Sequence, residues 1–442
     1  MTFKDLNINH SLLNALEEMG LSVPTPIQYK GFSVAMSGKD MVGIAQTGTG
    51  KTLAYLLPCL RQWAFNKEKH PTILIVVPTR ELVVQVVEEV EKLTKYMNVI
   101  AKGVFGGANI NTQALMLRDG VDVLVATPGR LLDLSLNGGV KLKYIKRFVV
   151  DEVDEMLDLG FRPQLVRVMD LLPDNRQNLM FSATMTDEIN AIIDDFFDHP
   201  VTVEAAPNGT PLENISQSAY FVPNFNTKAN LLKYLLNENK EMNKVLVFID
   251  SKKLADRLFD IIAPAFEGVT GVIHSNKAQN NRFATVQHFK DGDYRILIAT
   301  DIIARGLDVS EVSHVINFDL PDNPETYIHR IGRTGRADKK GIALAFITEK
   351  EKAYQEEIEL LMKREIDILD FPATVAISDV LIEEEKPVVK MKTIQVKITK
   401  KETDGAAFHE RSAKRQKVNV RTTRKSEMGK KYSKPQKRRP KK

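Results

Sequence analysis

Two short polar motifs carry the chemistry of this chain: AQTGTGKT at residues 45–52 and DEVD at residues 151–154. In the first motif, Gly48 and Gly50 lack a Cβ, so the backbone can wrap closely around a phosphate and direct its N–H groups inward. Lys51 can then reach the β- and γ-phosphates of a nucleoside triphosphate. The motif therefore predicts a phosphate-binding loop.

The surroundings of the loop support this interpretation. DMVGIA at 40–45 is typical of a buried strand, and the apolar stretch at 52–64 predicts a helix, which gives the strand–loop–helix order that the motif requires. The Thr52 hydroxyl can ligate Mg²⁺. The strict motif begins with Gly, whereas this chain has Ala45 and meets only the looser form. The alternative is a Gly/Thr-rich turn before a helix, and the strand–loop–helix order argues against it.

The acidic motif follows the apolar sequence FVV at the expected end of a strand, where open α/β sheets bind their ligands. An acidic run is more often a solvated face, but here it accompanies a phosphate loop. We expect Asp151 to hold Mg²⁺ through water and Glu152 to orient and deprotonate the attacking water. Asp154 would connect the site to neighbouring motifs. Together the two motifs predict a nucleoside triphosphatase.

Composition excludes several classes of protein. The chain has 442 residues, of which 43% are hydrophobic and 27% charged, as in a soluble globular protein of two or three domains. The single cysteine, Cys59, excludes a disulfide framework and a Cys-based metal site. The N-terminal segment has no signal-peptide pattern, and no apolar run is long enough for a membrane span. We therefore expect a cytoplasmic protein.

The basic residues are concentrated at the C-terminus. From His409 to Lys442, fifteen Lys or Arg residues accompany two acidic ones, a net charge of +13 where the whole chain carries +5. This segment has too few bulky apolar residues to fold alone. A basic arm of this kind favours contact with nucleic acid, with a solubility tail or a localisation signal as alternatives.

Apolar strands alternate with helical patterns through the body of the chain, which predicts two α/β domains with parallel sheets covered on both faces. We expect domains at 1–203 and 217–370, a linker at 204–216, and a largely disordered basic tail at 371–442. The second domain lacks a phosphate loop and could be a structural repeat of the first. The expected strands are 72–78, 121–128, 148–152, 178–184, 244–250, 269–275, 295–300, 314–319 and 342–348.

The order of the motifs resembles that of the DEAD-box ATP-dependent RNA helicases, especially minimal bacterial members with a basic tail. The resemblance covers residues 1–370. It implies two tandem RecA-like domains, ATP and Mg²⁺ as cofactors, and RNA-stimulated ATP hydrolysis. Hydrolysis would be coupled to local unwinding of short RNA duplexes or to remodelling of RNA–protein complexes. RNA bound largely independently of sequence is the implied partner, together with ribosomal or RNA-decay proteins.

The resemblance also places a nucleotide-binding motif at the N-terminus, where Phe3 precedes GLSVPTPIQ at 20–28. A Gln side chain has one acceptor and two donors, which can pair with N6 and N7 of adenine. Gln28 is thus the expected adenine reader, with Phe3 packed behind it; alone, Gln28 would be assigned to a surface helix. The implied nucleotide-binding residues are Phe3, Gln28, Ala45, Gln46, Thr47, Gly48, Thr49, Gly50, Lys51, Thr52, Asp154 and Asp308.

In the second domain, TDIIARGLD at 300–308 and HRIGRTGR at 329–336 resemble the strongest motifs of the family. Two glycines in eight residues argue against the alternative of a solvated basic helix. Arg333 and Arg336 fit arginine fingers, which stabilise transition-state charge on the γ-phosphate. The implied catalytic residues are Lys51, Asp151, Glu152, Arg333 and Arg336, and the implied metal ligands are Thr52 and Asp151.

Other motifs are expected to contact RNA phosphates through hydroxyls, backbone N–H groups and arginines, without reading bases. The implied RNA-binding residues are Pro78, Thr79, Arg80, Gly106, Gly107, Thr127, Pro128, Gly129, Arg130, Gln279, Arg282, Thr300, Arg305 and Gly306. SAT at 182–184 could hydrogen-bond back to Asp154. The implied coupling residues are Ser182, Ala183, Thr184, His329 and Arg330.

Two positions depart from the family pattern. Val153 stands where the family has Ala. The acids are intact, so we expect the chemistry to survive, whereas the two added methyl groups would crowd the packing beneath the loop. Asp250 replaces a common Asn, and we expect this carboxylate to point away from RNA phosphates. Two further functions are compatible with these motifs: an RNA-binding clamp with little turnover, and a DNA-translocating helicase. The intact catalytic residues argue against the clamp, and stimulation by RNA rather than DNA would separate the helicases.

Overall fold

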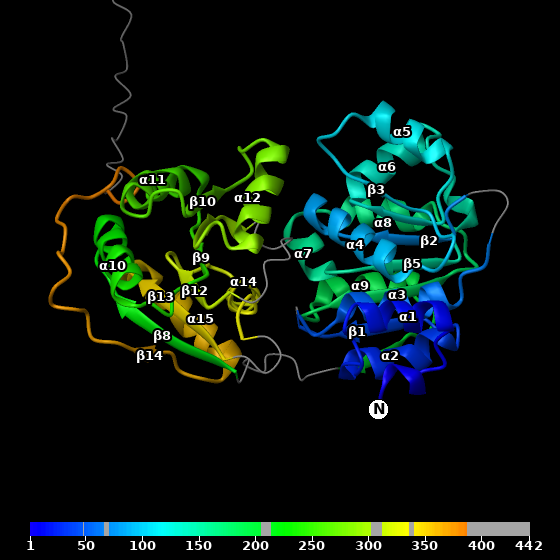
Figure 1. The fold of residues 1–442 in the computed structure, drawn as a ribbon, viewed down its shortest axis with the longest axis horizontal. Coiled ribbons are helices and arrows are strands. Elements are labelled where there is room, and N and C mark those ends of the chain that lie inside the picture. The colour runs from blue at the N-terminus through cyan, green and yellow to red at the C-terminus, as the bar shows by residue number, and fades with distance from the viewer. Residues whose placement is uncertain (47, 66–69, 205–213, 302–311, 336–339, 387–442) are drawn as a thin grey trace, which may run out of the picture. The chain divides into compact units, whose positions relative to one another are not determined.

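The computed structural model describes residues 1–46, 48–65, 70–204, 214–301, 312–335 and 340–386. They form two α/β domains, each built on a parallel seven-stranded sheet (Figure 1). No helix in the described ranges is long and apolar enough to cross a membrane. The two RecA-like domains expected from the sequence are confirmed.

The sheet of the first domain has the strand order β3-β4-β2-β5-β6-β1-β7, and all neighbouring strands run parallel. Its central strands are short and apolar because helices cover both faces and exclude water from each. The strands are β1 Met41–Ile44, β2 Ile73–Val76, β3 Ala101–Val104, β4 Val123–Ala126, β5 Arg147–Val150, β6 Gln177–Ser182 and β7 Val201–Glu204.

Helices alternate with these strands, and several begin at a polar cap. Thr79, for example, accepts a hydrogen bond from the N–H of Leu82, which satisfies a donor at the start of the next helix. The helices are η1 Phe3–Asp5, α1 His10–Glu18, α2 Pro26–Met36, α3 Lys51–Arg61, α4 Arg80–Leu93, α5 Ile110–Arg118, α6 Pro128–Leu136, η2 Leu142–Tyr144, α7 Val153–Asp158, α8 Arg162–Asp170 and α9 Asp187–Phe196.

The second domain repeats this topology. Its order is β10-β11-β9-β12-β13-β8-β14, so that strands counted from the start of each domain occupy the same places in both sheets. This confirms the expected structural repeat. The strands are β8 Ile215–Phe221, β9 Val245–Phe248, β10 Thr270–Ile273, β11 Ile296–Ala299, β12 His314–Asn317, β13 Gly341–Ile347 and β14 Asp367–Ile368.

The described helices of the second domain again lie between the strands and after them. Asn224 caps the first of these helices by accepting the N–H of Thr227 at 2.9 Å. The helices are α10 Phe225–Glu238, α11 Lys252–Ile262, η3 Ala263–Ala265, α12 Gln279–Asp291, α14 Pro324–Ile331, η4 Glu349–Glu351 and α15 Lys352–Met362.

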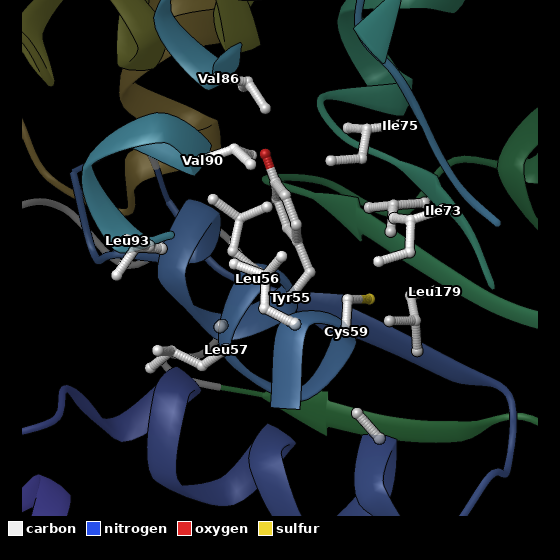
Figure 2. Packing of buried hydrophobic residues seen from close by; sticks show 14 of the residues in the cluster. Tyr55, Leu56, Leu57, Cys59, Ile73, Ile75, Val86, Val90, Leu93 and Leu179 are labelled. Atoms are coloured by element: carbon white, nitrogen blue, oxygen red, sulfur yellow. The ribbon is translucent and has the colours of Figure 1, made fainter. Parts of the chain in front are cut away.

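Alternation along the strands divides the core of the first domain into two clusters. Ile73 and Ile75 of β2 pack in one cluster with Tyr55 and other residues of α3 (Figure 2). Leu74 and Val76, which point to the opposite face, pack in the other cluster. Each face of the sheet is thus covered by apolar side chains, and the polar side chains of the motifs lie at the ends of the strands.

Several strands escaped prediction from the sequence. The edge strand β7 reads VTVE and exposes much of its length, and β3 contains a Lys and a Gly, so neither shows a continuous apolar run. β8 alternates polar and apolar residues, and its first two residues lie in the segment expected as a linker. The helix after the phosphate loop ends at Arg61, three residues earlier than expected.

Residues 371–386, which we assigned to the tail, pack on the second domain instead. Val375 and Ile382 are buried in its core, and Asn230 Nδ2 donates to the Ala376 carbonyl at 2.9 Å. The backbone N–H of Phe225 donates to Glu385 Oε1 at 2.6 Å. We call residues 371–386 the C-terminal strap. The sequence did not reveal it because its core contacts are sparse: Val375 and Ile382, seven positions apart, are buried, and Phe371 is partly buried against them.

Candidate active site

The phosphate loop connects β1 to α3. Ala45 continues the sheet by donating its N–H to the Ser182 carbonyl at 3.0 Å, and Gly50 directly precedes the helix. Gly50 has a φ of 86°, a left-handed conformation that favours glycine. A Cβ at this position would also lie 2.3 Å from Nε2 of Gln28, so both backbone and space require Gly.

Gln28 is buried on α2 and belongs to the loop rather than to the surface. Its Oε1 accepts the N–H of Thr25 at 2.9 Å, and its Nε2 donates to the Gly50 carbonyl at 3.1 Å. The side chain therefore joins the N-terminal motif to the phosphate loop. Phe3 is buried in the adjoining core, as expected. Adenine reading by Gln28 stays a prediction.

Lys51 and Glu152 form a buried ion pair, with Nζ 2.8 Å from Oε1. Burial lowers the pKa of Lys51, but the charges of Glu152 and Asp151 outweigh it and leave the pKa raised. The ammonium therefore stays protonated in a site from which water is largely excluded. This arrangement suits a group that binds phosphate as a point charge.

The acids follow β5 directly. Asp151 accepts the N–H of Glu152 at 3.0 Å, and Glu152 has a φ of 54°, which is uncommon for a residue with a side chain. Burial and the neighbouring charge of Glu152 raise the pKa of Asp151 to about 7. Strained backbone and closely spaced carboxylates are typical of functional sites.

The residues at this strand end fit a magnesium ion. Mg²⁺ prefers oxygen ligands, usually one or two carboxylates with substrate phosphates and water. Asp151 and Thr52 offer a buried carboxylate and a hydroxyl on adjoining elements. Glu152 Oε2 is buried and accepts no hydrogen bond from any residue of the described ranges. A cation here would relieve the crowding of negative charge.

Asp154 is bonded to the SAT segment as we expected. Its Oδ2 accepts the N–H of Ala183 at 2.9 Å, and the N–H and hydroxyl of Thr184 at 3.0 and 3.3 Å. Burial raises the pKa of Asp154, but the charges of His329 and Lys51 outweigh it and hold the pKa below its usual value. The ends of β5 and β6 are thereby linked through one carboxylate.

Val153 is accommodated within the core. Its side chain is fully buried at the start of α7 and belongs to the same apolar cluster as Val42 and Val150. The extra methyl groups of Val relative to Ala therefore lie against apolar neighbours, and the flanking acids keep their positions at the strand end.

The expected RNA-binding residues of the first domain meet at the ends of β2 and β4. Thr79 and Thr127 directly precede α4 and α6, and Arg80 lies over Gly107, where a Cβ would be 2.3 Å from the guanidinium. These residues surround a cavity of about 470 Å³. Its lining includes Pro78, Thr79, Arg80, Gly106, Thr127, Gly129, Arg130 and Arg282, while Pro128 is the first residue of α6.

Arg130 has a positioning role that the sequence did not indicate. It is buried, and its Nη1 donates to Gln113 Oε1 at 2.6 Å. Its Nη2 donates to the Ala108 carbonyl at 2.8 Å. Arg130 therefore holds the segment after Gly107 in place.

Arg330 organises the corresponding edge of the second domain. Its Nε and Nη2 donate to the two carboxylate oxygens of Asp301 at 2.5 and 2.6 Å, and its Nη1 donates to the Asp319 carbonyl at 2.6 Å. Asp250 Oδ1 lies 3.3 Å from Nη2 of Arg330. Burial and the charge of Asp319 raise the pKa of Asp250 to about 7, although Arg330 opposes the shift.

Other expected residues of the second domain are also buried. Thr300 follows β11, and Arg333 follows α14. The Nδ1 of His329 lies 3.4 Å from Glu155 Oε1, and Arg282 pairs with Glu81. His329, expected to serve coupling, and Arg282, expected to bind RNA, are therefore both paired with carboxylates.

Some expected residues lie outside the described part of the chain: Thr47, Arg305, Gly306, Asp308 and Arg336, together with the side chain of Gln279. Among the described loop residues, Gln46 and Thr49 are joined by a hydrogen bond of 2.7 Å from the Thr49 hydroxyl to the Gln46 carbonyl. Gly48 has a φ of 81°.

Sequence reasoning missed three polar residues near the strand ends. Glu155 is almost fully buried beside the acidic motif, Lys228 is buried in the second domain, and Tyr55 is buried on α3. The signal for Tyr55 was its position one helical turn after Lys51, which places it under the loop.

Comparison with known proteins agrees with this geometry. The DEAD/DEAH box helicase family model matches residues 25–192, and that of the helicase conserved C-terminal domain matches residues 227–338. The chain is 40% identical to the DEAD-box ATP-dependent RNA helicase CshA of Bacillus cereus over 84% of this chain and 70% of the relative. It is 39% identical to RhpA of Helicobacter pylori over 83% and 73%.

Solved structures give the same result. S. cerevisiae Dbp5 bound to RNA and ADP BeF3 is similar with a TM-score of 0.75 and 29% identity, over 83% of this chain and 95% of that one. With a phosphate loop, an acidic strand end and paired RecA-like sheets in place, the chain belongs to the DEAD-box ATP-dependent RNA helicases.

Proposed function

We propose that this chain couples ATP hydrolysis to the opening of short RNA duplexes through the residues described above. The observation that carries the proposal is the buried Lys51–Glu152 pair of 2.8 Å, which joins the start of α3 to the end of β5. It joins the phosphate-binding lysine to the expected general base. A chain that only clamped RNA would have no need for this pair.

The ion pair also sets the first step. When ATP binds, its phosphates replace the Glu152 carboxylate as the partner of the Lys51 ammonium. The carboxylate is thereby released. Gln28 would pair with adenine, and its hydrogen bond to the Gly50 carbonyl, which ties it to the loop, supports this role. Bound Mg²⁺, held by Asp151 and Thr52, would neutralise charge on the β- and γ-phosphates.

Hydrolysis then uses the freed carboxylate. Glu152 accepts a proton from water as the water oxygen bonds to the γ-phosphorus and the bond to the β–γ bridging oxygen breaks. Arg333 and Arg336 stabilise charge on the γ-phosphate. Asp154, bonded to Ala183 and Thr184, transmits the change to β6.

RNA is held through its backbone by the residues around the cavity at Thr79 and Thr127. Contacts from hydroxyls and arginines carry no base information, so recognition depends on phosphate and 2′-OH groups. Such binding suits many RNAs, and ribosomal or RNA-decay proteins would then select the target.

The deciding experiment measures steady-state phosphate release alone, with single-stranded RNA, and with DNA of the same sequence. We expect stimulation by RNA only, together with ATP-dependent separation of a short RNA duplex. Equal stimulation by DNA would identify a DNA translocase. RNA binding without hydrolysis would identify a clamp.

We also propose that residues 409–442 tether RNA through their net charge of +13. Each neutralised phosphate adds about −0.7 to the slope of log K against log salt for single strands. Truncation after Asp404 should therefore flatten the salt dependence of RNA binding and leave the rate at saturating RNA unchanged. An unchanged slope would favour a localisation role.

A further inference from the structure

Gln113 is a buried polar residue on α5 that none of the expected motifs includes. Its side chain is 7% exposed, and α5 packs against β3 and α6 (Figure 1). The amide makes two hydrogen bonds at once: Nε2 donates to the Phe105 carbonyl at 3.2 Å, and Oε1 accepts Nη1 of Arg130 at 2.6 Å. Gln113 therefore connects the segment after β3 to the first turn of α6.

The segment 105–108, which follows β3, is held at both of its ends. Gln113 binds the Phe105 carbonyl, and Nη2 of Arg130 donates to the Ala108 carbonyl at 2.8 Å. Because the two side chains are also bonded to each other, they form a closed brace around the segment. A buried network in which side chains and backbone groups pair in this way specifies one geometry of the chain.

The brace sets the direction of a backbone N–H group. A trans peptide is planar, so its N–H points opposite to its C=O. Since the Phe105 carbonyl is turned toward Gln113, the N–H of Gly106 points away from that side chain. Gly106 lines the cavity at the ends of β2 and β4, and a Cβ there would meet no described residue within 4 Å beyond its chain neighbours. Packing therefore does not require glycine here, and the open space suits the close approach of a ligand.

Arg130 is unfavourable for the fold by itself. Its guanidinium is buried, both of its hydrogen-bond acceptors are neutral, and it forms no ion pair with any described residue. A buried charge without a counter-ion costs free energy, and an apolar side chain would fill the place without that cost. Positive charge beside the cavity does favour the anionic backbone of RNA. The brace is therefore better explained by binding than by stability.

We infer that Gln113 is a positioning residue for RNA: together with Arg130 it fixes segment 105–108 so that the N–H of Gly106 is oriented to donate to a backbone phosphate before RNA arrives. The inference rests on the proposed function. It adds a residue outside the expected RNA-binding motifs, and it assigns Gln113 no contact with RNA.

The test compares the wild-type protein with Gln113→Leu, which removes both hydrogen bonds and keeps a side chain of similar size. ATPase activity is measured over a range of concentrations of single-stranded oligouridylate RNA. We expect the RNA concentration for half-maximal rate to rise about tenfold, the loss expected from one misplaced hydrogen bond to a charged group. The maximal rate and the KM for ATP should not change. The salt dependence of RNA binding should keep its slope, because the variant removes no charge.

Gln62→Leu provides the matched control. Gln62 makes the same pair of bonds, since its Nε2 donates to the Ala35 carbonyl at 3.2 Å and its Oε1 accepts Nη2 of Arg147 at 3.0 Å. Arg147 is the first residue of β5, so this pair lies at the end of the strand opposite to the acidic motif. Its removal should lower the melting temperature about as much as Gln113→Leu does and leave the RNA concentration for half-maximal rate unchanged.

The outcomes separate the inference from the function on which it rests. Wild-type protein without RNA-stimulated ATPase would overturn the proposed function. Normal wild-type stimulation, with the same RNA requirement in Gln113→Leu, would overturn the inference alone. An equal rise in both leucine variants would assign the effect to lost stability and also overturn it. If Gln113→Leu does not fold, Gln113→Glu takes its place with a rise in the same direction, because it keeps the acceptor for Arg130 and removes only the donor to Phe105.

Discussion

The two domains share one strand order, but they differ in the turn between the first strand and the helix that follows it. In the first domain, β1 leads through Gly50 into α3, and the helix start has no side-chain cap. In the second, β8 leads to Asn224, whose side chain caps α10. The free N–H groups of a helix start bind anions. In the first domain the N–H groups at the start of α3 have no side-chain cap and are available to a phosphate. In the second domain the side chain of Asn224 accepts the N–H of Thr227 at the start of α10.

The buried lysines show the same contrast. Lys51 pairs with Glu152, which follows the fifth strand of the first domain. Lys228 pairs with Asp319, which follows the fifth strand of the second domain, at 3.1 Å, and with Glu351 at 2.9 Å. The second network is closed by further hydrogen bonds to Glu351 from Leu320 and Thr348. One topology thus supports a reactive site in one copy and a structural ion network in the other.

The C-terminal strap provides a further hydrogen-bond acceptor for the start of α10. Glu385 accepts the N–H of Phe225 at the start of α10, the place where a phosphate would bind in the first domain. A carboxylate supplied by the chain therefore replaces the anionic ligand. The comparison teaches that a helix start that binds no phosphate still needs partners for its polar groups.

The largest effect on turnover should come from a change in the Lys51–Glu152 ion pair. Glu152→Gln removes the proton acceptor, so RNA-stimulated turnover should fall by about 10²-fold or more while ATP and RNA still bind. Asp319→Asn is the matched change in the second domain and should leave turnover per folded molecule intact. The measurement is single-turnover phosphate release. Near-normal release by Glu152→Gln would remove Glu152 from the base role.

Lys228→Ala should have the largest effect on stability. It leaves Asp319 and Glu351 buried without their counter-ion, and breaking a buried pair costs about 3–5 kcal/mol. Urea unfolding of the second domain, followed by hydrogen exchange in its strands, measures the loss. Lys352→Ala, which breaks a surface pair with Glu349, should cause little change. Equal losses of stability in the two variants would show that the buried ion network around Lys228 adds no more to stability than a surface ion pair.

Glu385→Ala should have an intermediate effect. It removes the acceptor for the N–H groups of Phe225 and Ile382, at 2.6 and 3.0 Å, and should destabilise the second domain by about 2 kcal/mol. ATP affinity should be unaffected. Glu383→Ala, at an exposed strap position, is the control and should not change the unfolding midpoint. A stable Glu385→Ala protein would show that the strap adds little to the fold.

Asp250→Asn should have the smallest effect, and that effect should depend on pH. The folded pKa of Asp250 is raised to about 7 from a usual value of 3.8, so the folded protein holds a proton that the unfolded chain has lost. Stability from this group is full below about pH 4 and declines as the pH rises to 7. Because the side chain is 54% exposed, water screens the effect to about 1 kcal/mol or less.

Urea unfolding at a series of pH values tests this prediction. Asp250→Asn should be more stable than the wild type at pH 8, and the difference should vanish near pH 4. An Asp250→Asn protein less stable than the wild type at pH 8 would mean that Arg330 dominates and that the carboxylate stabilises the fold in its charged form.

The motifs at the strand ends could be predicted because local rules govern them. The glycines of the phosphate loop and the apolar strands before each motif gave β1, β5 and the acidic site at the correct edge of the sheet. The bond between Asp154 and Thr184 was also predictable, since both follow neighbouring strands. The edge strands β7 and β14 were not, because half-exposed strands lack a continuous apolar pattern.

The sequence by itself determined the two-sheet architecture, the phosphate loop and the acidic motif at the end of β5, because periodicity and motif spacing act over short stretches of chain. Only the tertiary structure decided which buried polar groups became partners. Lys228 meets Glu351, 123 residues away, and Glu385 meets Phe225, 160 residues away. Such pairings follow from the strand order and from the need of buried polar groups for partners, which no local pattern encodes.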